Sequence, residues 1–487
     1  MKRLVGISMM VLLATGCEES VKQGDTGVPE TPLISGIDLD SMNVEVRPQD
    51  NFYEYANGKW LASTEIPADE IGWGSYMTLR KESLEQSRAI VEELASSQGL
   101  DAEQQKISDF FRAWMDESGI EARGIDALAS DLETIAALNN HRELAAYLGV
   151  SNPMGVDGPF NFYVGQDDKD STQYVVFFMQ TGLGMPDRDY YFDDSERGQF
   201  LMQAYGKYIA TILELSGYED PTGAAKRIVD LETRLAEIQW DKVDNRDADK
   251  VYNAYPDAEF SALLSNFNLG EYLAGIGVAR QPFVVVKQPS YFEAVNSLFP
   301  EVDVETWKEY LRLRLVSTYA NFLSEDFVQT RFDFYSKTLS GTEEQTPRWR
   351  RAVRSVNRSI GELLGKIYVE RHFSPESKEK TLEMVGYLNK AYAASIRDLD
   401  WMSDETKEKA LLKLSKFTSK IGYPDEWRDY SALSIVADDL VGNIKRARTF
   451  SHNRNVAKLG KPIDRKEWFM APDRKSTRLN SSHTSIS

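Results

Sequence analysis

The chain has four histidines, the residues most often used to bind a catalytic zinc ion. They are His141, His372, His452 and His483. None begins the His-Glu-x-x-His spacing that places two imidazoles on one face of a helix. His372 precedes Phe-Ser-Pro, which is typical of a helix start, and we expect these histidines to be separate, satisfied or solvated side chains. The residues alone therefore predict no metal site.

Other catalytic arrangements are also incomplete. There is no Gly-x-Ser-x-Gly segment, which would present a serine nucleophile. Gly361–Lys366 resembles a phosphate-binding loop, but it is one residue short and Ile367 replaces the Ser or Thr that would bind magnesium. Because the only thiol belongs to the N-terminal signal described below, the residues alone show no complete catalytic constellation.

Composition bounds the class of protein. The chain has 487 residues, of which 42% are hydrophobic and 27% are charged, a composition typical of globular proteins. The sequence has no internal repeat. Asp and Glu number 76 against 57 Lys and Arg, giving a net charge of −19. Nucleic-acid binding needs clustered cations, so we expect no nucleic-acid partner.

The N-terminus carries a targeting signal. Lys2 and Arg3 precede a short apolar stretch, and Ala14-Thr15-Gly16-Cys17 then resembles the cleavage and acylation site of bacterial lipoproteins. The apolar stretch is too short to span a bilayer. We expect residues 1–17 to be a lipoprotein signal peptide, Cys17 to be lipidated, and 18–35 to be a flexible linker. The alternative is an ordinary secretory signal with a chance cysteine. Lipidation would place the protein in a bacterial cell envelope, in the periplasm or at the outer membrane.

Most of the remaining chain has the periodicity of helices. Ile107, Phe110, Phe111, Trp114 and Met115 follow one apolar stripe, and Gly119 is expected to end that helix. Two β-prone segments, 160–164 and 174–178, predict a hairpin, and 283–286 predicts a third strand. The fold class is therefore mainly α with a small β component.

A series of collinear motifs between Gly36 and about Pro472 resembles the neprilysin and endothelin-converting-enzyme family of zinc endopeptidases. These motifs are Arg47–Trp60, Glu65–Pro67, Trp73–Tyr76, Gly182–Tyr191, Trp240, Asn245–Asp247, Lys250–Asn253, Gly361–Glu370, Trp401–Met402, Thr406–Lys407, Lys461–Arg465 and Trp468–Met470. Physically they are typical of scaffold. Asn57-Gly58 suits a tight turn, the tryptophans would anchor helix packing, and Asp187-Arg188-Asp189 could be a charge-paired buried knot.

The resemblance implies two lobes around a large internal cavity. Residues 36–83 and 430–472 would belong to a thermolysin-like catalytic lobe, and 84–429 to a mostly helical cap domain that admits only small peptides. It also implies proteolysis by a metalloendopeptidase whose zinc is held by His-Glu-x-x-His and a downstream Glu. We expect the protein to be a monomer. Some relatives use an Arg to contact the substrate carboxylate where this chain has Gly72.

In the family, every zinc-binding and catalytic residue follows the segment matched by Trp468–Met470. We therefore expect this chain to be the N-terminal portion only, without catalytic or metal residues of its own, binding no zinc and inactive as written. Residues 473–487 can be reverse-translated into a common sequencing-library adapter, so we interpret them as an artefactual tail; the alternative is a genuine polar C-terminus. Two other functions stay open: a non-catalytic peptide-binding or interaction lipoprotein, and a lipoprotein with a soluble domain of unknown role.

Overall fold

The computed structural model describes residues 38–468, in two units divided between Glu65 and Ile66. The described residues are predominantly helical with one small sheet, which confirms the predicted fold class. The helices of the described residues are α1 (Phe52–Ser63), α2 (Ser75–Ser96), α3 (Ala102–Met115), α4 (Glu117–Arg123), α5 (Ala129–Ala136), α6 (His141–Ser151), α7 (Glu196–Leu215), α8 (Pro221–Ile238), α9 (Asp257–Leu263), α10 (Leu269–Gly275), α11 (Pro289–Glu301), α12 (Val304–Tyr319), α13 (Glu325–Arg331), α14 (Arg348–His372), α15 (Pro375–Asp398), α16 (Asp404–Ser415) and α17 (Leu440–Val456). None of them is long and apolar enough to cross a membrane.

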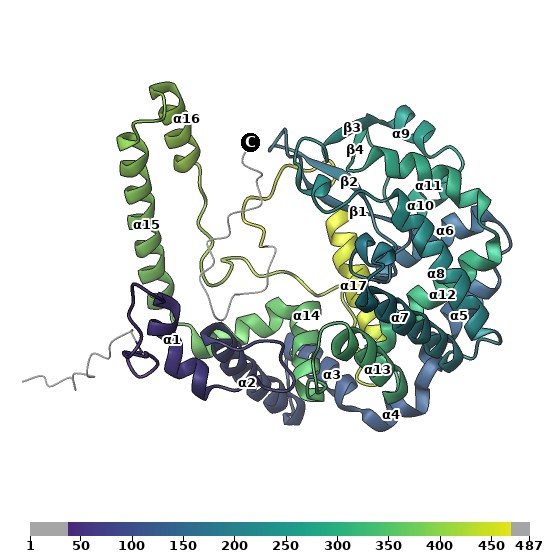
Figure 1. Cartoon of the computed structure of the whole chain (residues 1–487), viewed down its shortest axis with the longest axis horizontal. Coiled ribbons are helices and arrows are strands. Elements are labelled where there is room, and N and C mark those ends of the chain that lie inside the picture. The colour runs from purple at the N-terminus through teal and green to yellow at the C-terminus, as the bar shows by residue number, and fades with distance from the viewer. Residues whose placement is uncertain (1–37, 469–487) are drawn as a thin grey trace, which may run out of the picture. The chain divides into compact units, whose positions relative to one another are not determined.

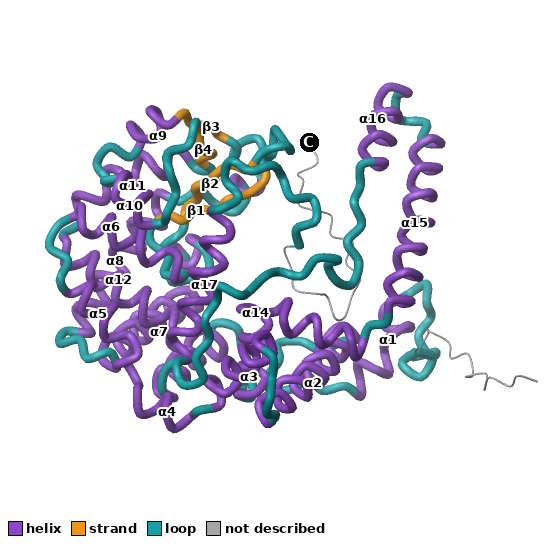
Figure 2. Tube along the Cα trace, turned by 180° about the vertical axis from the view of Figure 1, so that it is seen from behind, coloured by secondary structure: helices purple, strands orange, loops and turns teal. Residues whose placement is uncertain are grey.

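The four strands of the described residues form one small sheet beside α9 (Figures 1 and 2). They are β1 (Phe160–Gln166), β2 (Tyr174–Gln180), β3 (Asn253–Pro256) and β4 (Phe283–Val286), in the order β1-β2-β4-β3. The predicted hairpin is confirmed as the antiparallel pair β1–β2, and the predicted third strand is β4, parallel to β2. The sequence did not reveal β3, because three of its four residues are Asn, Ala and Pro, which are uncommon in strands. The proline is tolerated because β3 lies at the edge of the sheet.

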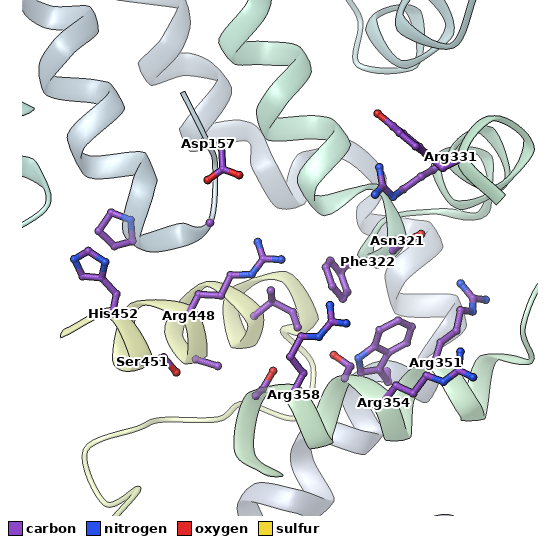
Figure 3. Close-up of a pocket in the computed structure, with 18 of the residues that line it drawn as sticks. Asp157, Asn321, Phe322, Arg331, Arg351, Arg354, Arg358, Arg448, Ser451 and His452 are labelled. Carbon is purple, nitrogen blue, oxygen red and sulfur yellow. The ribbon is translucent and has the colours of Figure 1, made fainter. Parts of the chain in front are cut away.

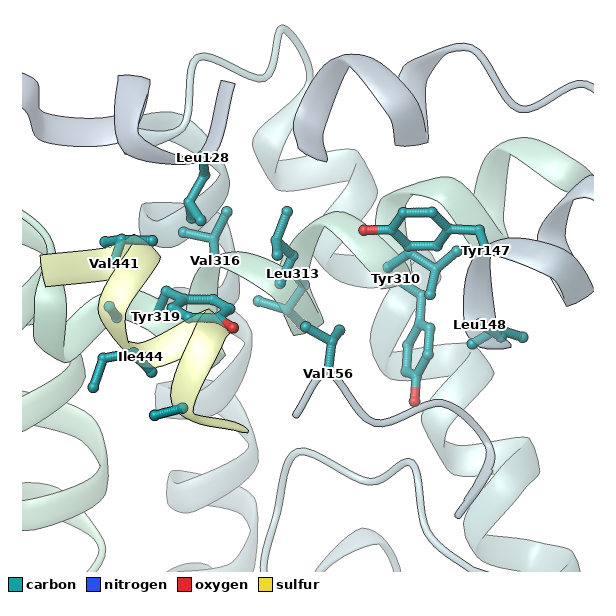
Figure 4. Packing of buried hydrophobic residues seen from close by; sticks show 14 of the residues in the cluster. Leu128, Tyr147, Leu148, Val156, Tyr310, Leu313, Val316, Tyr319, Val441 and Ile444 are labelled. Carbon is teal, nitrogen blue, oxygen red and sulfur yellow. The ribbon is translucent and has the colours of Figure 1, made fainter. Parts of the chain in front are cut away.

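The core of the second unit is organised around α12. Tyr310, Leu313, Val316 and Tyr319 lie three residues apart along this helix and are all buried (Figure 4). The hydroxyl of Tyr310 donates to the Gly182 carbonyl at 2.8 Å, and that of Tyr319 donates to the Met154 carbonyl at 2.6 Å. Both tyrosines are thus buried with their polar atoms satisfied.

Two helices from distant parts of the chain meet beside this core. Helix α14 packs against α2 and α3, burying one face that includes Val353, Val356 and Leu364. Its backbone is non-helical at Ile360, where φ is −134° and ψ is 37°. Helix α17 begins at Asp439, whose carboxylate accepts from the Gly442 amide at 2.9 Å, and it packs against α14. The uncovered faces of α14 and α17 can therefore line a common space.

Two glycines do not act as predicted. Gly119 lies inside α4. Helix α3, which Gly119 was expected to end, stops at Met115, and the carboxylate of Asp116 caps α4 by accepting from the Gly119 amide at 3.0 Å. Asn57-Gly58 forms no turn and lies within α1, in the first unit. A Cβ on Gly58 would come within 2.7 Å of Asn43, so close packing accounts for this glycine.

The predicted buried knot at Asp187–Asp189 is also wrong. Arg188 donates to the Ala236 carbonyl at 2.9 Å, while Asp187 caps a short 3₁₀ helix. Asp189 is exposed and pairs with Lys242 at 2.9 Å. Among the tryptophans expected to anchor helices, Trp60, Trp73 and Trp240 are partly buried, but Trp401 is 74% exposed between α15 and α16.

The lobe boundaries at residues 83 and 430 remain predictions. The predicted signal peptide 1–17, the linker 18–35 and the tail 473–487 all lie outside the described residues.

Candidate functional site

A cavity of about 800 Å³ lies within the second unit. Its wall is formed by α14, α17, the end of α13, the π-helical turn Phe332–Thr338 that follows α13, and the segment leading into β1. π-Helical turns of this kind are rare and often occur at functional sites. The volume falls within the range of about 300–1,000 Å³ typical of ligand pockets.

The wall of the cavity is strongly cationic. Five of its lining residues are arginines and only one, Asp157, is acidic, so the formal charge of the lining is 5 − 1 = +4. We call these five arginines the arginine wall; they are Arg331, Arg351, Arg354, Arg358 and Arg448. Figure 3 shows Arg331, Arg358 and Arg448 reaching from α13, α14 and α17 into the same space.

Two of these arginines are held by neutral groups. Arg331 donates to the Ser317 hydroxyl at 3.2 Å and lies 4.5 Å from the centroid of the Tyr335 ring. Arg448 donates to the Met154 carbonyl at 3.0 Å and lies 5.1 Å from the Tyr319 ring centroid. Carbonyl oxygens and aromatic faces orient a guanidinium without neutralising its charge.

The three arginines of α14 are spaced to share one face of the helix. Arg351, Arg354 and Arg358 lie at i, i+3 and i+7. Within residues 38–468, Nε and Nη1 of Arg351 and Nε of Arg354 are buried without a hydrogen-bond partner. Burial lowers the pKa of both guanidinium groups. The arginine wall thus contains partly buried guanidinium groups, and the described residues leave some of their N–H donors without a hydrogen-bond partner.

Carboxylates do little to neutralise this wall. Among the ion pairs of the described residues, one includes an arginine of the wall: Nη2 of Arg354 lies 3.7 Å from Glu70. Asp157 lies 4.0 Å from Arg314, which is not part of the lining. Burial raises the pKa of the Asp157 carboxyl, against the opposing fields of Arg314 and Arg448.

The described histidines occupy three separate places. His141 Nε2 lies 2.8 Å from the Val302 carbonyl. His372 ends α14, with its ring 4.9 Å from that of Tyr368. His452 lines the cavity, and its Nε2 lies 2.7 Å from the Ile276 carbonyl. His483 lies outside the described residues.

The described residues do not form a zinc site. Nowhere in residues 38–468 do three His, Cys, Asp or Glu side chains gather in a way that could hold a metal ion. The suspected phosphate loop, Gly361–Lys366, is part of helix α14, and Lys366 pairs with Glu103 at 3.0 Å. The segment is therefore helical and is not a loop. Cys17, the predicted lipidation site, lies outside the described residues.

Sequence reasoning missed the arginine wall. The spacing of Arg351, Arg354 and Arg358 was a readable signal, because three cations on one helix face are notable in a chain of net charge −19. Arg331 and Arg448 carried no such signal, since only the tertiary fold brings α13 and α17 to the same cavity.

Comparison with known proteins identifies the relatives of this chain. A family model described as peptidase family M13 matches residues 48–424. Endothelin-converting enzyme 1 of Cavia porcellus is 28% identical over 457 residues, which cover 89% of this chain and 60% of the relative. Neprilysin of Mus musculus is 25% identical over 508 residues, which cover 96% of this chain and 66% of the relative. The chain therefore spans about two thirds or less of the length of these curated relatives.

Solved structures of bacterial proteins are also similar. The zinc metalloprotease Zmp1 of Mycobacterium tuberculosis, in complex with an inhibitor, has a TM-score of 0.85 and 39% identity, covering 90% of this chain and 67% of that one. PepO of Lactobacillus rhamnosis has a TM-score of 0.79 at 21% identity, covering 87% of this chain and 68% of that one. The second similarity supports the fold alone.

Proposed function

We propose that this chain, which belongs to peptidase family M13, is the peptide-enclosing portion of a zinc-dependent endopeptidase that cleaves small peptides at a bacterial cell envelope. The observation that carries the proposal is the family match over residues 48–424, and the 39% identity to a structure of a zinc metalloprotease supports it. The described residues contribute the fold and the cavity. They do not fit a zinc ion, so we derive no catalytic step from them.

In this proposal the metal and the groups that act with it come from outside the described residues. The chain as given is then expected to bind peptides without hydrolysing them. The alternative of a non-catalytic peptide-binding lipoprotein makes the same prediction for this chain, so the longer reading frame has to distinguish the two.

The surface of α15 also supports a larger assembly. This helix of 24 residues has a single buried residue, Val385. Large apolar side chains are exposed along it, namely Leu382, Met384, Tyr387, Leu388 and Tyr392. Contiguous exposed apolar surface of this kind is typical of an interface. The longer M13 relatives suggest that further polypeptide of the same protein covers it.

The location is proposed from the N-terminal residues alone. Acylation of Cys17 would attach the protein to a membrane by multiple acyl chains, which is a stable anchor. A single anchored copy would act on peptides small enough to enter the cavity.

The first experiment is to read the genomic locus past the codon for Pro472, from a library prepared without that adapter. We expect the frame to continue into His-Glu-x-x-His. A frame that stops near Ser487 would overturn the peptidase proposal and favour the peptide-binding lipoprotein.

The second experiment compares this chain with the longer product, using a quenched fluorescent peptide of mixed composition. The longer protein should cleave it, and a zinc chelator should abolish the cleavage, whereas this chain should leave the peptide intact. Cleavage that the chelator leaves unchanged would contradict a zinc mechanism.

A further inference from the structure

The arginine wall carries positive charge that the carboxylates of the described residues largely leave unpaired. Of its five arginines, only Arg354 forms an ion pair with a carboxylate among the described residues, with its Nη2 3.7 Å from Glu70. Structural arginines usually form paired contacts with carboxylates or carbonyls, because an unpaired buried charge is costly. An arrangement that leaves such cations unpaired toward a cavity indicates an anionic ligand.

We propose that the arginine wall binds an acidic peptide segment carrying two or more carboxylates, and so selects acidic peptides among the substrates. This rests on the proposed function only in taking the ligand of the cavity to be a peptide.

The geometry favours carboxylates as the recognised groups. Guanidinium groups present two parallel N–H donors that match the two oxygens of a carboxylate. In Arg351 the buried Nε and Nη1 have no partner in the described structure. These two donors are enclosed, so a carboxylate in the cavity would accept from the guanidinium N–H groups that face the cavity and would offset the cost of burying the cation.

The distribution of charge favours a peptide over a small anion. The arginines come from three helices, and Arg331, Arg358 and Arg448 extend toward the cavity from different sides (Figure 3). A single phosphate or carboxylate would contact only some of them. An extended peptide with separated acidic side chains could contact several in a cavity of about 800 Å³.

Neutral parts of the lining suit a peptide as well. Phe322, Phe332 and Tyr335 offer apolar surface for side chains, and Asn152, Asn161 and Gln345 offer amides that can pair with a peptide backbone. Apolar surface beside polar groups is typical of sites that both bind a ligand and fix its orientation.

The test is equilibrium binding to the chain as it exists, by isothermal titration calorimetry. The two probes are an octapeptide with three glutamates and the same octapeptide with glutamines in their place. We expect the acidic peptide to bind at least tenfold more tightly at 50 mM NaCl, with the difference shrinking at 300 mM because salt screens charge.

Two variants locate the binding. Arg351→Gln and Arg358→Gln should each weaken binding of the acidic peptide at least fivefold and leave binding of the glutamine peptide within twofold. The matched control is the double variant Arg142→Gln/Arg234→Gln. It removes two arginines that pair with exposed acids outside the cavity, and should bind like the unaltered chain.

A stability measurement separates a binding role from a structural one. Arg351→Gln removes a partly buried cation that forms no ion pair within the described residues, so its urea midpoint should be unchanged or higher while its binding is weaker. A variant that binds weakly and also unfolds at lower urea would indicate a structural role for Arg351. The exposed Arg358 then serves as the second site, because its replacement should leave folding intact.

Several results would overturn the inference. These are equal affinity for the two peptides, no binding of either, unchanged binding by both cavity variants, or displacement of the acidic peptide by micromolar inorganic phosphate, which would indicate a small-anion site. Failure of the proposed function looks different, since a longer product that does not cleave peptides could still prefer the acidic octapeptide.

Discussion

Two arginines on helix α8 allow a controlled test of what burial does to an ion pair. Arg227 donates to Glu309 of α12 through Nε at 2.8 Å and Nη2 at 2.5 Å, and the side chain of Glu309 is 1% exposed. Arg234 pairs with Glu301 at 2.6 Å, and both side chains are about half exposed. The two arginines share a helix. They differ in the burial of the acid and in a second, exposed partner of Arg227, which also pairs with Asp220 at 3.2 Å.

The expected magnitudes follow from that difference. Breaking a fully buried pair costs about 3–5 kcal/mol, because it leaves an uncompensated charge. Arg227 is itself 44% exposed, and the Tyr218 hydroxyl still donates to Glu309 at 2.7 Å. We therefore expect Arg227→Ala to lower the free energy of unfolding by about 2 kcal/mol. Arg234→Ala should cost about 0.5 kcal/mol, as is usual for an exposed pair.

The assay is urea unfolding followed by far-ultraviolet circular dichroism at neutral pH. Adding Glu309→Gln to Arg227→Ala should recover part of the loss, since glutamine accepts from Tyr218 and leaves no buried charge. Equal costs for the two alanine variants would refute the reasoning. So would a double variant less stable than Arg227→Ala alone.

Three further predictions concern the core, pH and the anchor. Phe178 is fully buried in β2, and its change to alanine should cost about 3–5 kcal/mol of unfolding free energy. The exposed Phe200 is the control, and Phe200→Ala should cost under about 0.5 kcal/mol; urea unfolding measures both. Burial lowers the pKa of His452 in the folded protein. As pH falls, the imidazole is therefore protonated in the unfolded chain before it is protonated in the folded one. The free energy of unfolding should then decrease as pH drops through about 6.5. Urea midpoints measured from pH 7.5 to 5.5 should fall less for His452→Gln than for the unaltered chain. An equal dependence of the midpoint on pH in the two proteins would contradict this. Cys17→Ser should abolish incorporation of radiolabelled palmitate and release the protein from membranes, and persistent labelling would exclude Cys17 as the site.

The sequence predicted the elements whose signal is local. The alternating β-prone segments on either side of a polar turn predicted the β1–β2 hairpin, and the apolar stripe from Ile107 to Met115 predicted α3. Asn57-Gly58 failed as a turn signal because a tertiary constraint, close packing against Asn43, accounts for the glycine within a helix. Local patterns predict structure well where tertiary contacts do not override them.

The candidate site was hidden for a related reason. The arginines of α14 share a face that spacing could reveal, but their relation to Arg331 and Arg448 depends on how α13, α14 and α17 pack. Residues brought together only by packing leave no mark at a fixed sequence interval. A sequence motif is defined by fixed intervals between residues, so no motif could reveal that these arginines share a cavity.

Net charge is a poor guide to what this protein binds, for a physical reason. The chain carries −19 overall, yet the lining of the cavity carries 5 − 1 = +4. At physiological ionic strength the field of a solvent-exposed charge is screened within about 8 Å. Inside a cavity with low-dielectric walls, nearby charges act with far less screening. An acidic peptide that reaches the arginine wall would therefore respond mainly to the local cations. The acidic exterior would act chiefly on approach, so we expect the association rate for acidic peptides to rise with salt while their affinity falls.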